Sequence, residues 1–209
     1  MALKTFTAAA TSGSEAETQR LAAALAELLR PGDVVCLYGE LGAGKTYFAK
    51  GLVTGLGGEA RAVTSPTFVL LQTYEVRQVP PSPATPSGLP PSLRLPASPR
   101  LRRTSRRTGR RAKDGQKGRR LTVSHFDAYR LKSAQELVDI GSDEILCGEG
   151  ISIIEWADHV AQALPAERLE VHLASGGETV RRLRFVGRGA RPAKCVAELA
   201  ARRLVREVS

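Results

Sequence analysis

The apolar residues of this 209-residue chain alternate between strand-like runs and helix-like spacing. Runs of apolar residues at 34–38 and 151–156 are typical of strands buried on both faces. A capping sequence at 14–17 precedes leucines at helical spacing, and apolar positions 48, 52, 53 and 56 mark one face of a second helix. Because strands and helices alternate, the sequence predicts an α/β fold with a mostly parallel central sheet flanked by helices.

Further elements complete this prediction at both ends of the chain. We expect strands at 3–8, 169–173 and 180–186, which would supply antiparallel edges, and a hairpin formed by 68–76 and 121–126. Helices are expected to begin at Ser133 with a capping box, to span 158–164, and to end the chain at 193–207.

Proline and arginine are concentrated between residues 77 and 120. This segment holds 8 of the 12 prolines, 13 of the 31 lysines and arginines, one acidic residue and no aromatic residue. A segment of this composition buries too little apolar surface to offset the entropy of ordering it. We therefore expect one domain over 1–209, interrupted at 77–120 by a disordered insertion at the hairpin tip.

The net charge of +10 comes from that segment, whose own charge is 13 − 1 = +12. The other 165 residues carry 31 − 13 = 18 basic and 21 − 1 = 20 acidic side chains, a net charge of −2. The high isoelectric point therefore does not describe the folded part. Without aromatic residues between its arginines, the insertion is expected to bind nucleic acid weakly and without sequence preference.

Composition also excludes several classes of protein. No apolar run approaches the length of a membrane span, and the first ten residues lack the features of a secretory signal. Three cysteines, at Cys36, Cys147 and Cys195, show no C-x-x-C spacing, so neither a disulfide framework nor a zinc site is expected. These features favour a cytoplasmic protein.

A phosphate-binding loop is the strongest chemical signal. Residues 39–46, read as GELGAGKT, match G-x-x-x-x-G-K-[ST] at every fixed position, between a predicted strand and a predicted helix. Lys45 is expected to reach the β- and γ-phosphates of ATP, and the Thr46 hydroxyl to hold Mg²⁺. The backbone amides expected to bind phosphate are those of Leu41, Gly42, Ala43, Gly44, Lys45 and Thr46.

Two carboxylates follow predicted strands and fit the remaining roles at such a site. Glu155 ends the 151–155 run, and Asp127 ends the run that begins at Leu121. One of them is expected to help hold Mg²⁺ and the other to position water, and the sequence leaves the assignment open. Thr67, or Ser65, in the S-P-T-F segment lies where a nucleotide-sensing switch would be.

Other chemically active side chains are expected to be structural or surface residues. His125 and His159 lack metal-ligand spacing, and Trp156 is expected to be a core or interface residue rather than a base-stacking one.

Taken together, the motifs resemble those of one family. GELGAGKT at 39–46, SPTF at 65–68, HFDAYRL at 125–131 and IIEW at 153–156 are similar to the ordered motifs of the bacterial TsaE family of small ATPases. The resemblance covers residues 5 to about 186, apart from the insertion, and HFD-x-YRL with E-W is its specific part. The insertion, Tyr47 and Ala157 depart from the family pattern.

The resemblance implies a P-loop NTPase fold and a function. Members act in forming threonylcarbamoyladenosine at adenosine 37 of tRNAs that read ANN codons, as ATP-hydrolysing accessories of the TsaD–TsaB complex. By this resemblance Lys45 binds ATP, Thr46 and Glu155 hold Mg²⁺, and Asp127 acts near the metal or the attacking water. The adenine would lie near residues 14–18.

Two alternatives remain open at this stage. The same phosphate loop would serve a small kinase that acts on a small-molecule or nucleoside acceptor. The arginine-rich segment would instead make the chain a nonspecific nucleic-acid-binding module, in contact with tRNA through its phosphates.

Overall fold

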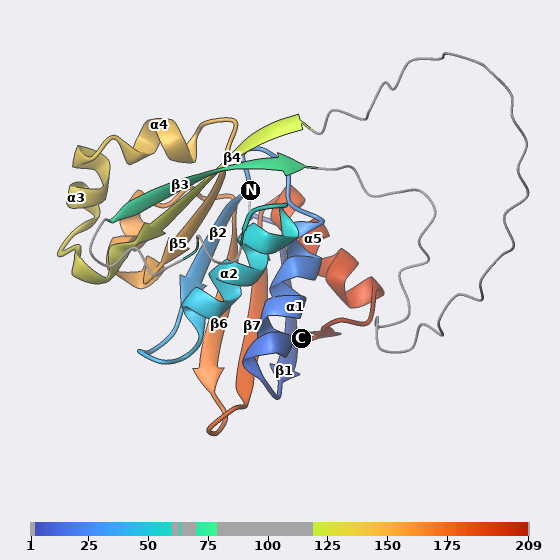
Figure 1. Ribbon diagram of the computed structural model, residues 1–209. Helices are drawn as coiled ribbons and strands as arrows, with labels where there is room; N and C mark the ends of the chain where they lie inside the picture. Colours follow the sequence, from blue (N-terminus) through green and yellow to red (C-terminus); the bar gives the residue numbers. More distant parts are fainter. Residues whose placement is uncertain (1–2, 60–62, 64–69, 79–118, 209) are drawn as a thin grey trace, which may run out of the picture.

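The computed structural model describes residues 3–59, 63, 70–78 and 119–208. Most of the predicted insertion and all of the SPTF segment lie outside these residues, so the predictions for them are not tested here. The described strands form a single eight-stranded sheet in the order β3-β4-β5-β2-β6-β7-β1-β8 (Figure 1).

The centre of the sheet is parallel and its edges are antiparallel, which confirms the predicted fold class. The parallel strands are β4 (Arg119–Asp127), β5 (Ile151–Glu155), β2 (Val34–Tyr38) and β6 (Arg168–Ser175). The antiparallel strands are β3 (Leu71–Gln78) on one side and β7 (Arg181–Arg188), β1 (Thr5–Ser12) and β8 (Arg206–Glu207) on the other.

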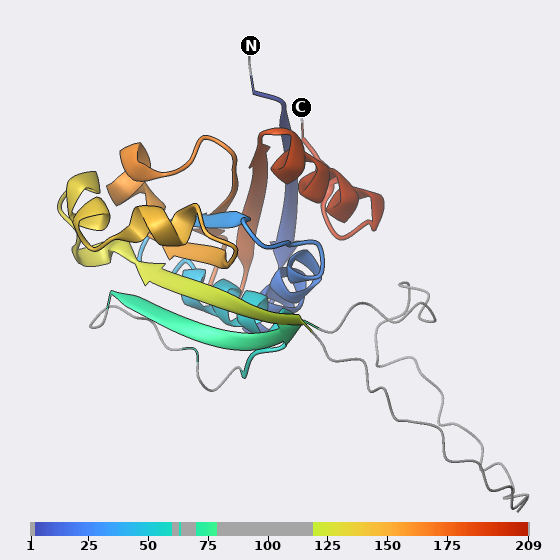
Figure 2. The same ribbon diagram turned by 90° about the horizontal axis from the view of Figure 1, so that it is seen from above.

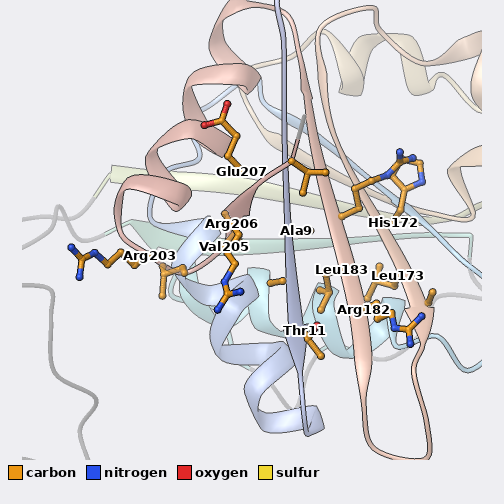
Figure 3. A pocket seen from close by; sticks show the side chains of 15 residues that line it. Ala9, Thr11, His172, Leu173, Arg182, Leu183, Arg203, Val205, Arg206 and Glu207 are labelled. Carbon is orange, nitrogen blue, oxygen red and sulfur yellow. The ribbon is translucent and has the colours of Figure 1, made fainter.

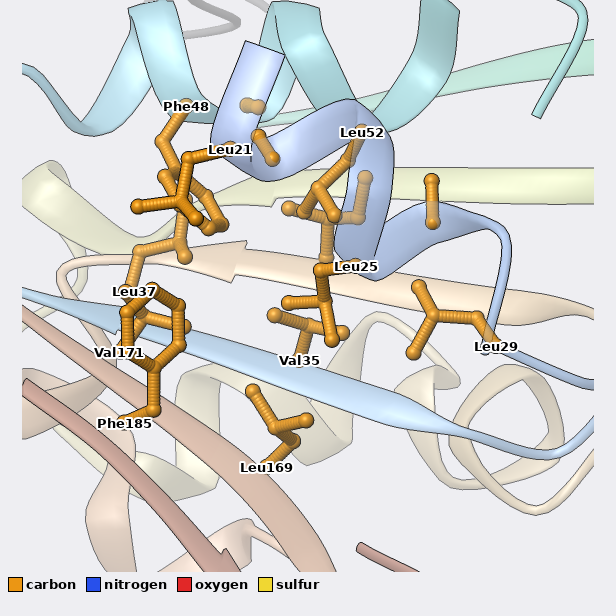
Figure 4. Packing of buried hydrophobic residues seen from close by; sticks show 14 of the residues in the cluster. Leu21, Leu25, Leu29, Val35, Leu37, Phe48, Leu52, Leu169, Val171 and Phe185 are labelled. Atoms are coloured by element: carbon orange, nitrogen blue, oxygen red, sulfur yellow. The ribbon is translucent and has the colours of Figure 1, made fainter. Parts of the chain in front are cut away.

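One face of the sheet is covered by three helices: α1 (Glu15–Ala26), α2 (Lys45–Gly55) and α5 (Ala190–Ala201). Leu25 and Leu52 pack with Val35 of β2 and the aromatic pair Phe48 and Phe185, all of them fully buried (Figure 4). Removing this much apolar surface from water is the main stabilisation of the fold. The packing fixes α2, and with it the phosphate loop, against the end of β2.

The opposite face is covered over β4, β5 and β2 by short helices, which lie far from α5 (Figure 2). They are η3 (Ala128–Arg130), α3 (Ala134–Asp139), α4 (Ser142–Leu146) and η4 (Ala157–Ala163). Leu137 of α3 packs there with Phe126 and Ile154. No helix of the described part covers this face over β6, β7 and β1, so the far half of the sheet is open on that side.

Both predicted helix N-caps are confirmed, but the second bond of each capping box is shifted by one residue: Glu17 and Glu136 accept from the backbone N–H of Gly13 and Lys132. Ser14 accepts a hydrogen bond from the backbone N–H of Glu17, and Ser133 accepts one from Glu136. These contacts satisfy backbone donors that have no partner inside a helix. The α1 cap also fixes the chain direction just beyond β1.

Several predicted boundaries were wrong, including that of the first strand, which spans Thr5–Ser12 rather than 3–8. The hairpin strands run further than expected, to Gln78 in β3 and back to Arg119 in β4, because backbone pairing continues beyond the apolar positions. The last helix spans 190–201 rather than 193–207. After it the chain turns at Arg203, which has a positive φ of 58°, buries Val205 in the core, and pairs with β1 as β8.

The remaining sequence predictions that the structure tests concern cysteines and membrane spans. All three cysteines are free. Within the described residues, no helix combines the length and apolar character needed to cross a membrane.

An ionic cluster forms around a buried carboxylate on the open side of β6. The Glu170 carboxylate accepts hydrogen bonds from Arg188 Nε at 2.6 Å and Arg168 Nε at 3.0 Å, and lies 3.4 Å from His172 Nε2. Burial favours a higher pKa, but the hydrogen bonds from His172 and Arg188 and the charges of both arginines lower the pKa of Glu170 to about 2.

This cluster predicts a pH-dependent contribution to stability. Glu170→Gln should lower the free energy of unfolding at pH 7 by about 2 kcal/mol, since it removes a charged acceptor from three donors. Because the folded pKa of about 2 lies below the ordinary 4.5, the stabilisation is present above pH 4.5 and is lost as the pH falls towards 2. Urea unfolding across that range should show that the difference in unfolding free energy between Glu170→Gln and the unmodified chain becomes smaller as the pH falls. Glu178→Gln, at an exposed position, is the matched control. A difference that does not change with pH would contradict the prediction.

Candidate nucleotide-binding site

The phosphate loop follows β2 directly, as the sequence predicted. At Gly39 the backbone has φ 140°, and a Cβ would lie 2.2 Å from the carbonyl oxygen of Leu173, so a side chain does not fit. Gly44 begins α2 with φ 102°, a left-handed conformation that glycine adopts without strain. The two glycines bend the chain so that successive N–H groups and the start of α2 face one point, the arrangement that binds phosphate.

Lys45 is almost buried, with 5% of its side chain exposed. Its Nζ donates to the backbone oxygens of Gly39 at 2.6 Å and Glu40 at 3.0 Å, and lies 3.5 Å from the ring centroid of Trp156. Burial lowers the pKa of Lys45, against the attraction of nearby carboxylates, chiefly Glu155. The ammonium is therefore held at the loop, where it would meet a phosphate.

The two predicted carboxylates meet beside this loop. β4 and β5 are parallel and pair Asp127 with Glu155, while β5 and β2 pair Glu155 with Leu37. Both acids are 2% exposed. Thr46 Oγ1 donates to Glu155 Oε2 at 3.0 Å, and Asp127 Oδ1 accepts from the backbone N–H of Tyr129 at 3.0 Å. The structure thus brings together Lys45, Thr46, Asp127 and Glu155.

His125 belongs to this cluster, although the sequence analysis assigned it a structural or surface role. The ring is fully buried, and its Nε2 lies 2.9 Å from Glu155 Oε1. Its Nδ1 has no hydrogen-bond partner within the described residues. His125 and Asp127 are two residues apart on one strand and therefore share a face. This spacing was the sequence signal that could have placed His125 at the site.

Two further residues of the site were also missed. Trp156 packs against the apolar cluster that contains Phe126 and Ile154, as predicted for a core residue. Its ring also covers Lys45 and lies 5.0 Å from that of Tyr129. On the other side, Arg181 Nε of β7 lies 3.5 Å from the position a Cβ would take at Gly44. No sequence motif marks Arg181, because the sheet brings it to the loop from 137 positions along the chain.

The other predicted site residues divide into two groups. Leu41 is 81% exposed, Gly42 is open to solvent and Ala43 is buried, and phosphate binding by their backbone amides stays a prediction. Thr67 and Ser65 lie outside the described residues, and their switch role stays a prediction.

The donor set fits Mg²⁺ with a nucleotide. A hydroxyl and two carboxylates, at Thr46, Glu155 and Asp127, are the oxygen ligands that Mg²⁺ prefers. No group of three or more His, Cys, Asp or Glu side chains in the described part is placed to enclose a metal. Mg²⁺ at nucleotide sites usually takes its other ligands from phosphate and water.

This loop on a parallel sheet, with acids at the neighbouring strand end, defines the class of P-loop NTPase folds. The chain is similar to the crystal structure of Bacillus subtilis YdiB, with a TM-score of 0.62 and 26% identity, covering 96% of this chain and 97% of that one.

The relatives then identify the family. The family model described as "Threonylcarbamoyl adenosine biosynthesis protein TsaE" matches residues 12–82 and 112–183. Proteins named tRNA threonylcarbamoyladenosine biosynthesis protein TsaE are similar to the chain. The one from Rickettsia conorii is 34% identical, over 78% of this chain and 69% of its own, and the one from Bacillus subtilis is 32% identical, over 84% and 82%. The chain belongs to the TsaE family.

The contact between His125 and Glu155 leads to a prediction about metal use. His125→Leu would leave Glu155 Oε1 buried without its partner, a loss of about 1–3 kcal/mol, and we expect the carboxylate to move away from Thr46. Turnover should fall about tenfold or more, and the Mg²⁺ concentration for half-maximal ATP binding should rise.

The matched variant is His125→Gln, whose amide N–H can still donate to Glu155. It should retain turnover and Mg²⁺ dependence within a few-fold. Calorimetric Mg-ATP titrations and urea unfolding of both variants separate positioning from folding. Equal Mg²⁺ dependence in the two variants would show that His125 does not position Glu155.

Proposed function

We propose that this chain is a Mg²⁺-dependent ATPase that supports threonylcarbamoyl transfer to adenosine 37 of tRNAs reading ANN codons, as an accessory of the TsaD–TsaB complex in the cytoplasm. The proposal depends above all on one observation: the hydroxyl of Thr46 in the phosphate loop is hydrogen-bonded to the buried carboxylate of Glu155 at the end of β5. Membership of the TsaE family supports the pathway.

The position of each residue in the site indicates its role in ATP binding and hydrolysis. The amides of 41–46 and the Lys45 ammonium would bind the β- and γ-phosphates, and Thr46 and Glu155 would hold Mg²⁺, which neutralises charge on the phosphates during transfer. Asp127, at the same sheet edge, would orient the attacking water. Trp156 and Arg181 lie on two sides of the loop and would hold Lys45 and the nucleotide in place.

Reconstitution tests the proposal directly. Purified TsaD, TsaB and tRNA are combined with threonine, bicarbonate and ATP, with the enzyme activity that makes the threonylcarbamoyl donor supplied separately, and modified adenosine is measured with and without this chain. The chain should raise product formation, and phosphate should be released without a phosphorylated acceptor. Phosphate transferred to an acceptor would favour the kinase alternative. Unchanged product formation would contradict the accessory role.

A further inference from the structure

The uncovered half of the sheet presents a surface that the nucleotide site does not use. We call it the open face: the side of β6, β7, β1 and β8 that points away from α1 and α2. Strand pairing places Arg206, Ala9, Arg184 and His172 in one row across the four strands, and Thr11, Arg182 and Ala174 in the next. Residues paired across antiparallel strands share a face, so these rows lie side by side on the surface.

The arginines of these two rows are exposed and unneutralised. Arg182, Arg184 and Arg206 are exposed, and no ion pair joins them to an acid among the described residues. Arg182 and Arg184 alternate along one strand, which puts their Cα atoms about 7 Å apart. At 182, 184 and 206 the face thus presents cations where a covering helix would require apolar side chains.

The buried carboxylate of this face, Glu170, is already neutralised by two neighbouring arginines. Glu170 is 3% exposed and is held by Arg168 and Arg188 from the same side of the sheet. It therefore cannot neutralise the arginines of the two neighbouring rows. Glu207 of β8 lies beside these rows, but within the described residues no ion pair joins it to Arg182, Arg184 or Arg206.

Charge along the chain shows the same asymmetry. Outside 77–120, residues before 168 carry 8 basic and 16 acidic side chains, a net charge of −8, whereas 168–209 carry 10 basic and 4 acidic, a net charge of +6. The end of the chain that builds the open face is thus strongly basic beside an acidic body. Such an asymmetry steers polyanions towards one side of a protein.

The floor between the arginines is formed by small, polar and aliphatic residues. A hollow there is lined by Ala9, Thr11, Ala174 and His172 and by the aliphatic Leu204 and Val208, with Arg182 and Arg206 on opposite sides of β1 (Figure 3). Protein interfaces usually have an apolar core with aromatic anchors, and no Phe, Tyr or Trp lines this hollow. Arginine forks and a threonine hydroxyl around a low floor are instead the groups that contact phosphate and sugar.

We propose that the open face binds the phosphate backbone of RNA, through Arg182, Arg184 and Arg206. The choice of RNA rests on the proposed function, since the pathway modifies tRNA. The surface is separate from the nucleotide site, because Arg182 and Arg184 point away from the side on which Lys45 and Arg181 lie. The arginine-rich 77–120 segment carries charge of the same sign, which makes it an unfavourable occupant of this face.

The experiment measures binding of a fluorescent tRNA transcript by anisotropy at several salt concentrations, without ATP. To reduce the contribution of the 77–120 segment, all proteins are full-length and carry glutamine in place of the eight arginines between 94 and 111. The test variant is Arg182→Gln/Arg184→Gln. The control is Arg20→Gln/Lys194→Gln, which removes the same charge from exposed positions on α1 and α5.

The test variant should bind about tenfold or more weakly at low salt, and the slope of log affinity against log salt should fall by about 1.5 to 2 in magnitude, as for two lost phosphate contacts. The control should change neither value, and both variants should hydrolyse ATP normally. Adding Lys45→Ala should leave RNA binding intact even though nucleotide binding fails, so this proposal and the ATPase proposal are tested independently.

Equal weakening in the test and control variants would overturn the proposal, because it would show a net-charge effect alone. Unchanged RNA binding in the test variant would also overturn it. If that variant bound RNA normally but no longer bound purified TsaD–TsaB, the open face would be a surface for an acidic protein rather than for RNA.

Discussion

Lys45→Ala should abolish ATP hydrolysis and leave the fold intact. The side chain supplies the positive charge held at the phosphate loop, and it contacts carbonyl oxygens and a ring rather than the apolar core. Removing a single preorganised donor from a transition state typically costs about 10²–10³-fold in rate. Phosphate release from Mg-ATP should therefore fall by at least that factor, while thermal unfolding stays close to that of the unmodified chain.

Trp156 provides an internal readout for the same change. It is the only tryptophan of the chain, and the Lys45 ammonium lies against its ring. When phosphate draws the ammonium away, the emission of Trp156 should change, and this nucleotide-dependent change should be absent from Lys45→Ala. Lys50→Ala, one turn further along α2, is the matched control and should behave as the unmodified chain. Near-normal turnover in Lys45→Ala would refute the NTPase assignment.

The predictable part of the site is the part encoded by neighbouring residues. The phosphate loop is a contiguous motif between a strand and a helix, so its residues fix both its geometry and its chemistry. Asp127 and Glu155 were predictable because each ends an apolar strand, and parallel strands bring their carboxyl ends to one edge. The fold class followed from the same alternation of strand and helix.

The residues that were missed act across the sheet. His125 becomes a partner of Glu155 through the register of β4 and β5, and Arg181 reaches Gly44 because β7 lies two strands away from β2. Neither register nor strand order can be read from local spacing. The end of α5 was misplaced for a related reason: basic residues late in a helix are favourable, but burial of Val205 and pairing with β1 outweighed that preference.

The open face shows how a total can hide a local charge. The sum over all residues outside 77–120 is −2, which argued against a basic surface on the folded part. That sum combines an acidic body with a basic end, and strand alternation then places Arg182 and Arg184 on one side of β7. The surface therefore emerges only when the chain's charge is mapped onto the sheet.

Substitutions of the two acids of the site should cause different defects in ATP binding and hydrolysis. Glu155 shares its carboxylate between Thr46 and His125, so Glu155→Gln removes the charge beside the Thr46 hydroxyl and sets an amide N–H against one of these donors. Mg-ATP binding and turnover should both weaken. Asp127 accepts a backbone N–H through Oδ1, a contact that Asp127→Asn keeps, so ATP should bind nearly normally while hydrolysis falls about 10²-fold.

Isothermal titration with ATP, in the presence of Mg²⁺ or of EDTA, separates the two variants when it is combined with a phosphate-release assay. Glu155→Gln should lose the Mg²⁺-dependent part of the affinity, whereas Asp127→Asn should retain it. Asp143→Asn, exposed on α4, is the control for loss of one negative charge. A reversed pattern would exchange the two roles. If both substitutions left turnover within about twofold, a change of under 1 kcal/mol in the barrier, neither carboxylate would take part in hydrolysis.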